Sequence, residues 1–286
     1  MTTPVKLVGF LLALVAVFVA ARGVGAVTNP VAAEPVAHDD MAPANGGHGD
    51  EHDGEDEAVG APGGLQVSDQ GYTLRVLGVR PLRFVVDDPD GHVVKVYDLV
   101  HEKPLHLVAV RRDGSGYQHL HPTLSDDGVW SIDVDLDPGT TRLIADFTPR
   151  KGPALILGTD VQQAGAFRPA EPPEPTATAT VGGYDVSLTG DLVPGESSPV
   201  TLTVSRAGAP VTDLQPHLGA YGHLVALREG DLAYLHVHPE ESAAGPEIPF
   251  RVEVPSEGRY RLFLDFRHGG VVRTAPFTVE TGTHEH

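Results

Sequence analysis

Residues 106–122 read HLVAVRRDGSGYQHLHP, and residues 223–239 read HLVALREGDLAYLHVHP. Subtracting 106 from 223 gives an offset of 117 residues, and at this offset the two stretches align without a gap. In each stretch, two runs of mainly β-branched, aliphatic and aromatic residues flank a pair that suits a two-residue turn, Asp-Gly at 113–114 and Gly-Asp at 230–231. The pattern predicts two equivalent β-hairpins.

The predicted turns fix which residues lie opposite one another across each hairpin. The expected pairs are His106 with His121, Val108 with His119, His223 with His238 and Val225 with His236. Because side chains alternate between faces with period two, the three histidines of each hairpin share one face. Opposed Cβ atoms are about 4.5 to 5.5 Å apart, a span that imidazoles can close around one ion. The candidate metal ligands are therefore His106, His119, His121, His223, His236 and His238.

Composition restricts the metal. The 286 residues include no cysteine, and their two methionines are Met1 and Met41, so thiolate and thioether-rich sites are excluded. Three neutral imidazoles suit copper, zinc or nickel and leave one coordination position open. We expect cupric copper or zinc, and no organic cofactor.

The same residues allow a plainer interpretation. The histidine faces also carry Val108, Val110 and Tyr117 in the first hairpin, with similar residues in the second, so each is partly a core face. Duplicated domains can retain such residues for the fold alone. The sequence also leaves open whether the two hairpins build separate sites or face one another.

Five further residues are candidate ligands or partners of ligands. The stretch RLIADF at 142–147 aligns with RLFLDF at 261–266, with an offset of 119, and places Asp146 and Asp265 at equivalent positions. Each could be a fourth ligand or could orient an imidazole. The other three are His101, His217 and His268; His101 and His217 differ by 116 and are therefore not strictly equivalent.

Residues 1–27 are a predicted membrane-targeting segment. Lys6 precedes an apolar run at 7–21, which fits either a signal-peptide core cleaved after Ala26 or a short uncleaved anchor helix. Arg22 favours the anchor, because arginine can extend to the membrane interface. We expect a cell-membrane protein with one N-terminal anchor and extracytoplasmic domains, or a secreted protein if the segment is cleaved.

The remaining chain divides by composition. Residues 28–64 are rich in Pro, Ala, Gly and acidic residues, include three histidines and predict a disordered linker. Two units at 65–168 and 177–281 flank a Pro-rich linker at 169–176, and 282–286 is a tail. Both units have short alternating runs bounded by Gly, Pro and Asp turns, without helical periodicity. The predicted fold is all-β, with two tandem antiparallel Ig-like β-sandwich domains.

The formal net charge of −19 argues against nucleic acid and anionic membrane surfaces as partners, because both would repel the chain. The sequence contains no phosphate-binding glycine loop, no Gly-x-Ser-x-Gly elbow, no His-Glu-x-x-His motif and no dinucleotide fingerprint. We therefore do not expect an enzyme.

The blocks at 102–122 and 214–239 resemble a family of membrane-anchored or secreted two-repeat proteins of high-GC Gram-positive bacteria. The resemblance covers nearly the whole chain after the linker at 28–64, and the six histidines of the two hairpins match the family pattern. Position 217 departs from it, because an aromatic residue is more common there. Members are mostly uncharacterised and often labelled heavy-metal-binding, so the resemblance implies a metal- or copper-handling context.

Together these features predict an extracytoplasmic, membrane-anchored protein that binds a metal ion for buffering, sensing or delivery. Its expected partners are the ion itself and other metal-handling proteins of the envelope. The alternative is a non-catalytic tandem Ig-like module with an interaction or structural role in the cell envelope.

Overall fold

The computed structural model describes residues 62–235, 237–240 and 242–281. The predicted anchor at 1–27, nearly all of the linker at 28–64, the tail at 282–286 and His236 therefore lie outside the described residues. Every regular element in the described ranges is a β-strand. Those ranges contain no helix long and apolar enough to span a membrane.

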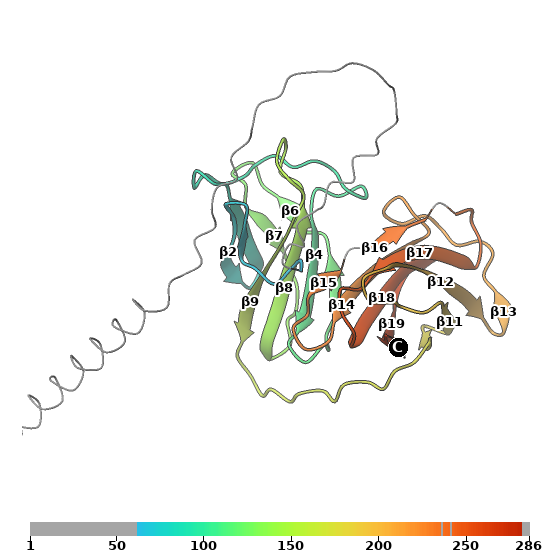
Figure 1. The fold of residues 1–286 in the computed structure, drawn as a ribbon. Helices are drawn as coiled ribbons and strands as arrows, with labels where there is room; N and C mark the ends of the chain where they lie inside the picture. The colour runs from blue at the N-terminus through green and yellow to red at the C-terminus, as the bar shows by residue number, and fades with distance from the viewer. Residues whose placement is uncertain (1–61, 236, 241, 282–286) are drawn as a thin grey trace, which may run out of the picture. The chain divides into compact units, whose positions relative to one another are not determined.

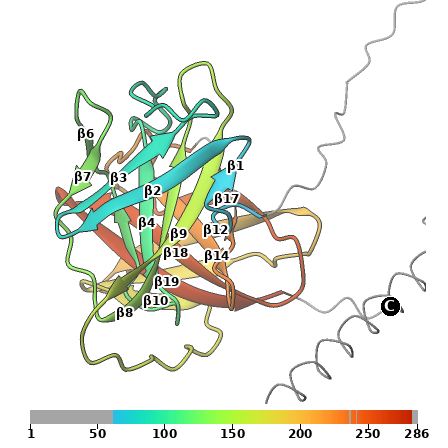
Figure 2. The same ribbon diagram turned by 90° about the vertical axis from the view of Figure 1, so that its left-hand side faces the viewer.

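The first repeat consists of two antiparallel sheets with the orders β1-β2-β3-β7-β6 and β5-β4-β8-β9. Figure 2 shows β2 and β3 in front of β4, β8 and β9. The strands are β1 (Ser68–Asp69), β2 (Tyr72–Val79), β3 (Leu82–Asp87), β4 (His106–Arg111), β5 (Gln118–Leu120), β6 (Thr123–Leu124), β7 (Trp130–Ile132), β8 (Gly139–Phe147) and β9 (Leu155–Gln163).

The second repeat has sheets with the orders β10-β11-β12-β17-β16 and β15-β14-β18-β19, and β13 pairs with β12. The strands are β10 (Thr178–Val181), β11 (Tyr184–Thr189), β12 (Ser197–Arg206), β13 (Ala209–Pro210), β14 (Gly222–Arg228), β15 (Tyr234–Leu235), β16 (Val237–Pro239), β17 (Glu247–Glu253), β18 (Arg259–His268) and β19 (Val271–Glu280). Both repeats share one arrangement, in which β2-β3-β7-β6 packs against β4-β8-β9 in the first and β11-β12-β17-β16 packs against β14-β18-β19 in the second. This is the strand order of Ig-like sandwiches. The predicted all-β fold with two tandem sandwiches is confirmed.

Each sandwich has its own core. In the first, the fully buried Trp130 packs against Phe84 and Tyr97, with ring centroids 6.3 and 5.0 Å away. In the second, Tyr184 packs against Phe266, with ring centroids 5.5 Å apart. Alternation along the strands, such as the buried and exposed positions of β11, supplies the apolar face of each sheet.

The strand β4 is buried on both of its faces. Leu107 and Ala109 belong to the core of the first repeat, whereas Val108 and Val110 point the other way into a third apolar cluster. This interface cluster joins the sheet β5-β4-β8-β9 to β15-β14-β18-β19, which lie side by side in Figure 1. Its members are Val108, Val110, Tyr117, Ile144, Ile156, Val225, Leu227, Leu232, Tyr234 and Phe263. The two hairpins therefore face one another across a single interface.

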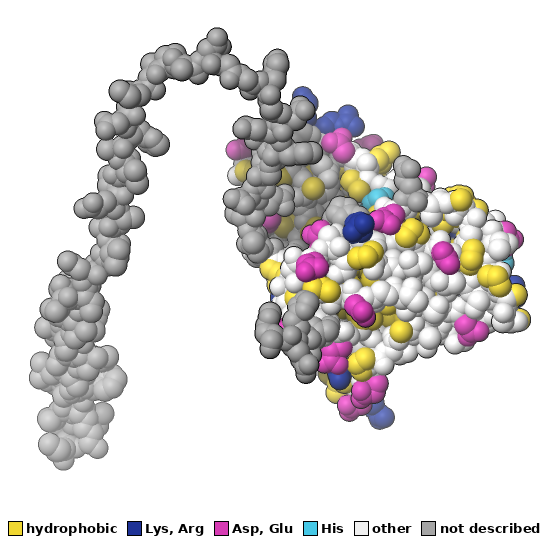
Figure 3. Space-filling view, turned by 45° about the vertical axis from the view of Figure 1, so that its right-hand side comes forward, with side chains coloured by type: hydrophobic (Ala, Val, Ile, Leu, Met, Phe, Trp, Pro, Cys, Tyr) yellow, Lys and Arg dark blue, Asp and Glu magenta, His cyan; other side chains and the backbone are white. Residues whose placement is uncertain are grey.

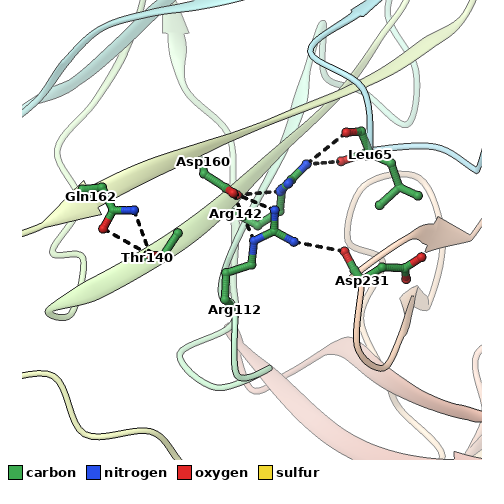
Figure 4. Close-up of polar contacts among 8 residues, drawn as sticks. Leu65, Arg112, Thr140, Arg142, Asp160, Gln162 and Asp231 are labelled. Carbon is green, nitrogen blue, oxygen red and sulfur yellow. Dashed lines mark hydrogen bonds and ion pairs between the residues drawn. The ribbon is translucent and has the colours of Figure 1, made fainter. Parts of the chain in front are cut away.

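Stacking and polar contacts complete the interface. Tyr117 lies parallel to Phe263 with the ring centroids 3.8 Å apart. Arg112 pairs with Asp160 of its own repeat and donates to the backbone carbonyl of Asp231 in the other repeat at 3.3 Å (Figure 4). These contacts lock the loop of the first hairpin onto the second repeat.

The first hairpin has the predicted register, with Val108 opposite His119. Its turn is not the predicted pair at 113–114. The backbone N–H of Gly114 donates to the carbonyl of Arg111 at 2.8 Å, so the turn is centred on residues 112–113. The Asp113 carboxylate accepts the N–H of residue 115, and such side-chain capping favours this wider loop over a two-residue turn.

The second hairpin departs further from the prediction. Its loop is closed by a bond from Arg228 N–H to the carbonyl of Ala233, so it is longer than the expected pair at 230–231. Among the described residues, β15 pairs with β14 as far as Leu235, and the next strand, β16, pairs with β17 of the opposite sheet, where His238 lies opposite Arg251. The predicted His223–His238 pair is therefore wrong. The chain must cross between sheets to build the fourth strand of the sandwich, and here it crosses before reaching residue 238.

Candidate metal centre

Three histidines of the first repeat converge at one end of its hairpin. His106 begins β4 and is 4% exposed, His119 lies in β5, and His121 follows that strand. The Nδ1 atom of His106 is 3.1 Å from Nε2 of His119 and 3.2 Å from Nε2 of His121. In a tetrahedral site with metal–nitrogen bonds of about 2.0 to 2.1 Å, ligand nitrogens are about 3.3 Å apart. Two of the three nitrogen separations therefore already match those of a metal site.

Hydrogen bonds on the outer sides of two rings determine which nitrogens carry protons. Nε2 of His106 is 2.9 Å from the Val100 carbonyl, which can only accept, so this nitrogen is the donor. Nδ1 of His119 is 2.8 Å from Oδ2 of Asp265, so it too is the donor. In the neutral tautomers that result, His106 Nδ1 and His119 Nε2 direct lone pairs at one another. Two lone pairs 3.1 Å apart repel one another, and a cation between them, either a proton or a metal ion, would remove that repulsion.

The carboxylate that orients His119 comes from the other repeat. Asp265 lies on β18, is 4% exposed and also accepts a hydrogen bond from the Thr274 hydroxyl. A carboxylate bonded to the outer nitrogen of an imidazole is the usual support of a metal-binding histidine, because it fixes the ring and strengthens the ligand. Sequence reasoning named Asp265 but missed Thr274 and the Val100 carbonyl, which carry no recognisable sequence pattern.

Two further histidines join this cluster. His223 of the second repeat stacks on His106, with ring centroids 5.2 Å apart and an angle of 8°, and lies 4.9 Å from His119. His101 contacts His106 and His223 edge-on, at 6.1 and 5.2 Å. The two repeats therefore build one composite histidine cluster at their interface. Within the described ranges, the histidines whose ligand atoms all lie within 4.8 Å of one another are His106, His119 and His121.

Burial keeps three imidazoles of the cluster neutral. It lowers the pKa of His106 to about 4, of His121 to about 3 and of His223 to about 2, and neighbouring histidines add to each shift. These three imidazoles are therefore in the metal-binding form at neutral pH, and no proton has to be displaced from them.

The remaining candidates have other surroundings. Asp146 lies opposite His106 in the pairing of β4 with β8, and its carboxylate is hydrogen-bonded to Tyr234; burial raises its pKa to about 6. His217 begins a turn ahead of β14, and burial lowers its pKa. His268 is bonded through Nδ1 to the Tyr184 hydroxyl at 2.6 Å, and its Nε2 pairs with a surface aspartate.

The last two candidates are His236 and His238 of the second hairpin. His238 is on β16, in the sheet opposite the one that carries His223, and His236 is outside the described residues. A second group of metal-ligand side chains, Asp88, Asp90 and His92, lies on an exposed turn. There the Asp88 carboxylate accepts the backbone N–H groups of the other two, which explains the group as a capped turn.

Comparison with protein-family profiles gives a match in the second repeat. The profile of a family described as a domain of unknown function (DUF8832) matches residues 179–283, nearly the whole second repeat. No curated protein matches the chain.

Proposed function

We propose that this protein binds one cupric copper or zinc ion through His106, His119 and His121. The observation that carries the proposal is the pair of opposed lone pairs on His106 and His119, 3.1 Å apart, with His121 at the same spacing. A single proton can bridge only two of these nitrogens. A metal ion satisfies all three and leaves one position for water or an exchanging ligand.

One ion per chain is expected, although the sequence contains two hairpins. The second hairpin sends His238 into the opposite sheet, and His223 turns instead toward the histidines of the first repeat. Absence of thiols restricts the donors to nitrogen and oxygen, which favours cupric copper or zinc.

The proposed setting is the outer face of a cell membrane. It rests on the apolar run at 7–21, followed by an acidic linker, in the sequence. A net charge of −19 favours collection of cations and disfavours nucleic acid. On the face shown in Figure 3, acidic side chains are scattered among uncharged ones and basic side chains are few. Buffering, sensing or delivery of the metal to other envelope proteins is the role that we propose, without catalysis.

One observation favours the second candidate, a structural or interaction module. If His119 is protonated, its two N–H groups serve Asp265 and His106, and the pair becomes an ionic link between the repeats. In that case the cluster would only hold the sandwiches together.

Calorimetric titration of the full chain with zinc and with cupric ion, separately and in a non-chelating buffer, distinguishes the two. We expect saturable binding of one ion, micromolar or tighter, and its loss in the double variant His119→Ala/His121→Ala. The matched control is His92→Ala, which removes an exposed histidine and should leave this binding intact. If the wild-type chain gives only weak, non-saturating heats, or if the double variant retains the stoichiometry, the metal centre is wrong.

A further inference from the structure

A two-residue turn at residues 100–103 carries His101 into the histidine cluster. The turn is closed by reciprocal bonds between Val100 and Lys103, with N–H to carbonyl distances of 2.9 and 3.0 Å. Its central residues, His101 and Glu102, have φ angles of 46° and 64°. Such turns favour glycine or asparagine, because the left-handed conformation costs other residues about 1 to 2 kcal/mol each.

The second repeat contains the same turn at the same offset of 117 residues. It spans residues 217–220, and its central residues are Leu218 and Gly219, with φ angles of 56° and 82°. Leu218 takes the place of His101 and is 3% exposed. The turn therefore does not require histidine, and in the first repeat a strained position is occupied by an exposed imidazole.

His101 lies between a solvent-accessible cavity and the buried histidines of the cluster. Its side chain lines a cavity of about 490 Å³, together with Tyr221 and Glu240. On its other side the ring contacts His106 and His223. The same turn holds His106, since the Val100 carbonyl accepts its Nε2 proton. An ion in the cavity would meet His101 before it reached His106, which is 4% exposed.

We propose that His101 is the exchange ligand of the metal centre, a role that rests on the proposed function. His101 binds the hydrated ion at the cavity, and the nitrogens of the triad then replace its water ligands and His101 itself. Release follows the reverse path, with His101 entering the open coordination position as a triad nitrogen leaves. Because His101 acts on the path and not in the final complex, its loss slows binding and release equally and leaves the equilibrium unchanged.

The test uses the full chain loaded with zinc and mixed with a chromogenic chelator in a stopped-flow instrument, alongside equilibrium titration. The variant is His101→Asn, because asparagine tolerates the left-handed conformation and keeps the turn without an imidazole. Glu102→Asn is the matched control, since it changes the other strained residue of the same turn and keeps His101.

We expect His101→Asn to slow zinc transfer by about tenfold while the dissociation constant changes by less than about threefold, and Glu102→Asn to behave as wild type. Transfer at the wild-type rate from His101→Asn would overturn the exchange role while leaving the metal centre intact. Faster release with a matching loss of affinity would also overturn it, because His101 would then be a resident ligand. A wild-type chain that does not bind zinc would remove both proposals.

Discussion

Replacing Asp265 by asparagine tests how much of the metal affinity comes from the second repeat. The carboxylate accepts Nδ1–H of His119 at 2.8 Å and the hydroxyl proton of Thr274. Asparagine keeps the size and can still accept the imidazole proton, but the negative charge that strengthens His119 as a ligand is lost. Removing such a supporting carboxylate typically weakens metal affinity about 10- to 100-fold, or about 1.4 to 2.7 kcal/mol.

The structure places the expected loss near the lower end of that range. Asp265 supports one of the three proposed ligands, while His106 is held by the Val100 carbonyl, which the substitution leaves in place. We therefore expect about a tenfold weaker dissociation constant for zinc in Asp265→Asn, measured by calorimetric titration at neutral pH.

The control for this prediction is Asp146→Asn, the equivalent change in the first repeat. The Asp146 carboxylate is bonded to Tyr234 and not to a ligand, so the loss of affinity should be clearly smaller. Nitrogen NMR of the His119 imidazole should show a proton on Nδ1 in the wild type. Equal affinity of Asp265→Asn and wild type, or equal losses in the two variants, would refute the orienting role.

Two further predictions concern stability. The metal-free protein should become less stable as pH falls from about 6.5 to about 4, because burial lowers the pKa of His106 to about 4 and the unfolded chain takes up the proton first. The shift of His106 alone corresponds to about 3 kcal/mol. The lowered pKa values of His121 and His223 act in the same direction, and the raised pKa of Asp146 acts in the opposite direction. Urea unfolding across this range would show a flat profile if the histidines were exposed. Phe263→Ala removes the ring stacked on Tyr117 and should cost about 3 to 5 kcal/mol in urea unfolding. A cost below about 1 kcal/mol would mean that the interface is loosely packed.

The sequence was sufficient for the features that depend on neighbouring residues. Alternation correctly placed Leu107 and Val108 on opposite faces of a strand, and the hairpin register put Val108 opposite His119. For the same reason His106, His119 and His121 could be grouped in advance, since a single hairpin brings them together. The length of the loop hardly mattered, because the register stayed the same when the turn was wider than expected.

Features that depend on distant segments could not be predicted. Alternation indicates that a strand has a second apolar face but not what covers it, and here the other repeat does. His119 and Asp265 are 146 residues apart, so their contact follows only from the packing of the two sandwiches. The equivalence of the two hairpins in sequence also led to a wrong prediction for the second one, because a sequence repeat does not fix where the chain crosses between sheets in each repeat. For that reason His238 pairs with β17 of the opposite sheet and not with the first strand of its hairpin. The residues between 223 and 239 show no pattern that indicates where the chain crosses from one sheet to the other.

Both halves of the histidine cluster are carried by one chain, joined by the segment between β9 and β10 in Figure 1. The proposed metal site is therefore assembled within a single molecule, and its affinity for the metal should not depend on the protein concentration. Cleavage between residues 169 and 176 would remove this advantage, because the second repeat would then have to find the first by diffusion. Two separate repeats would need a high protein concentration to reach the occupancy of the composite cluster that the linker at 169–176 supplies by keeping them close together.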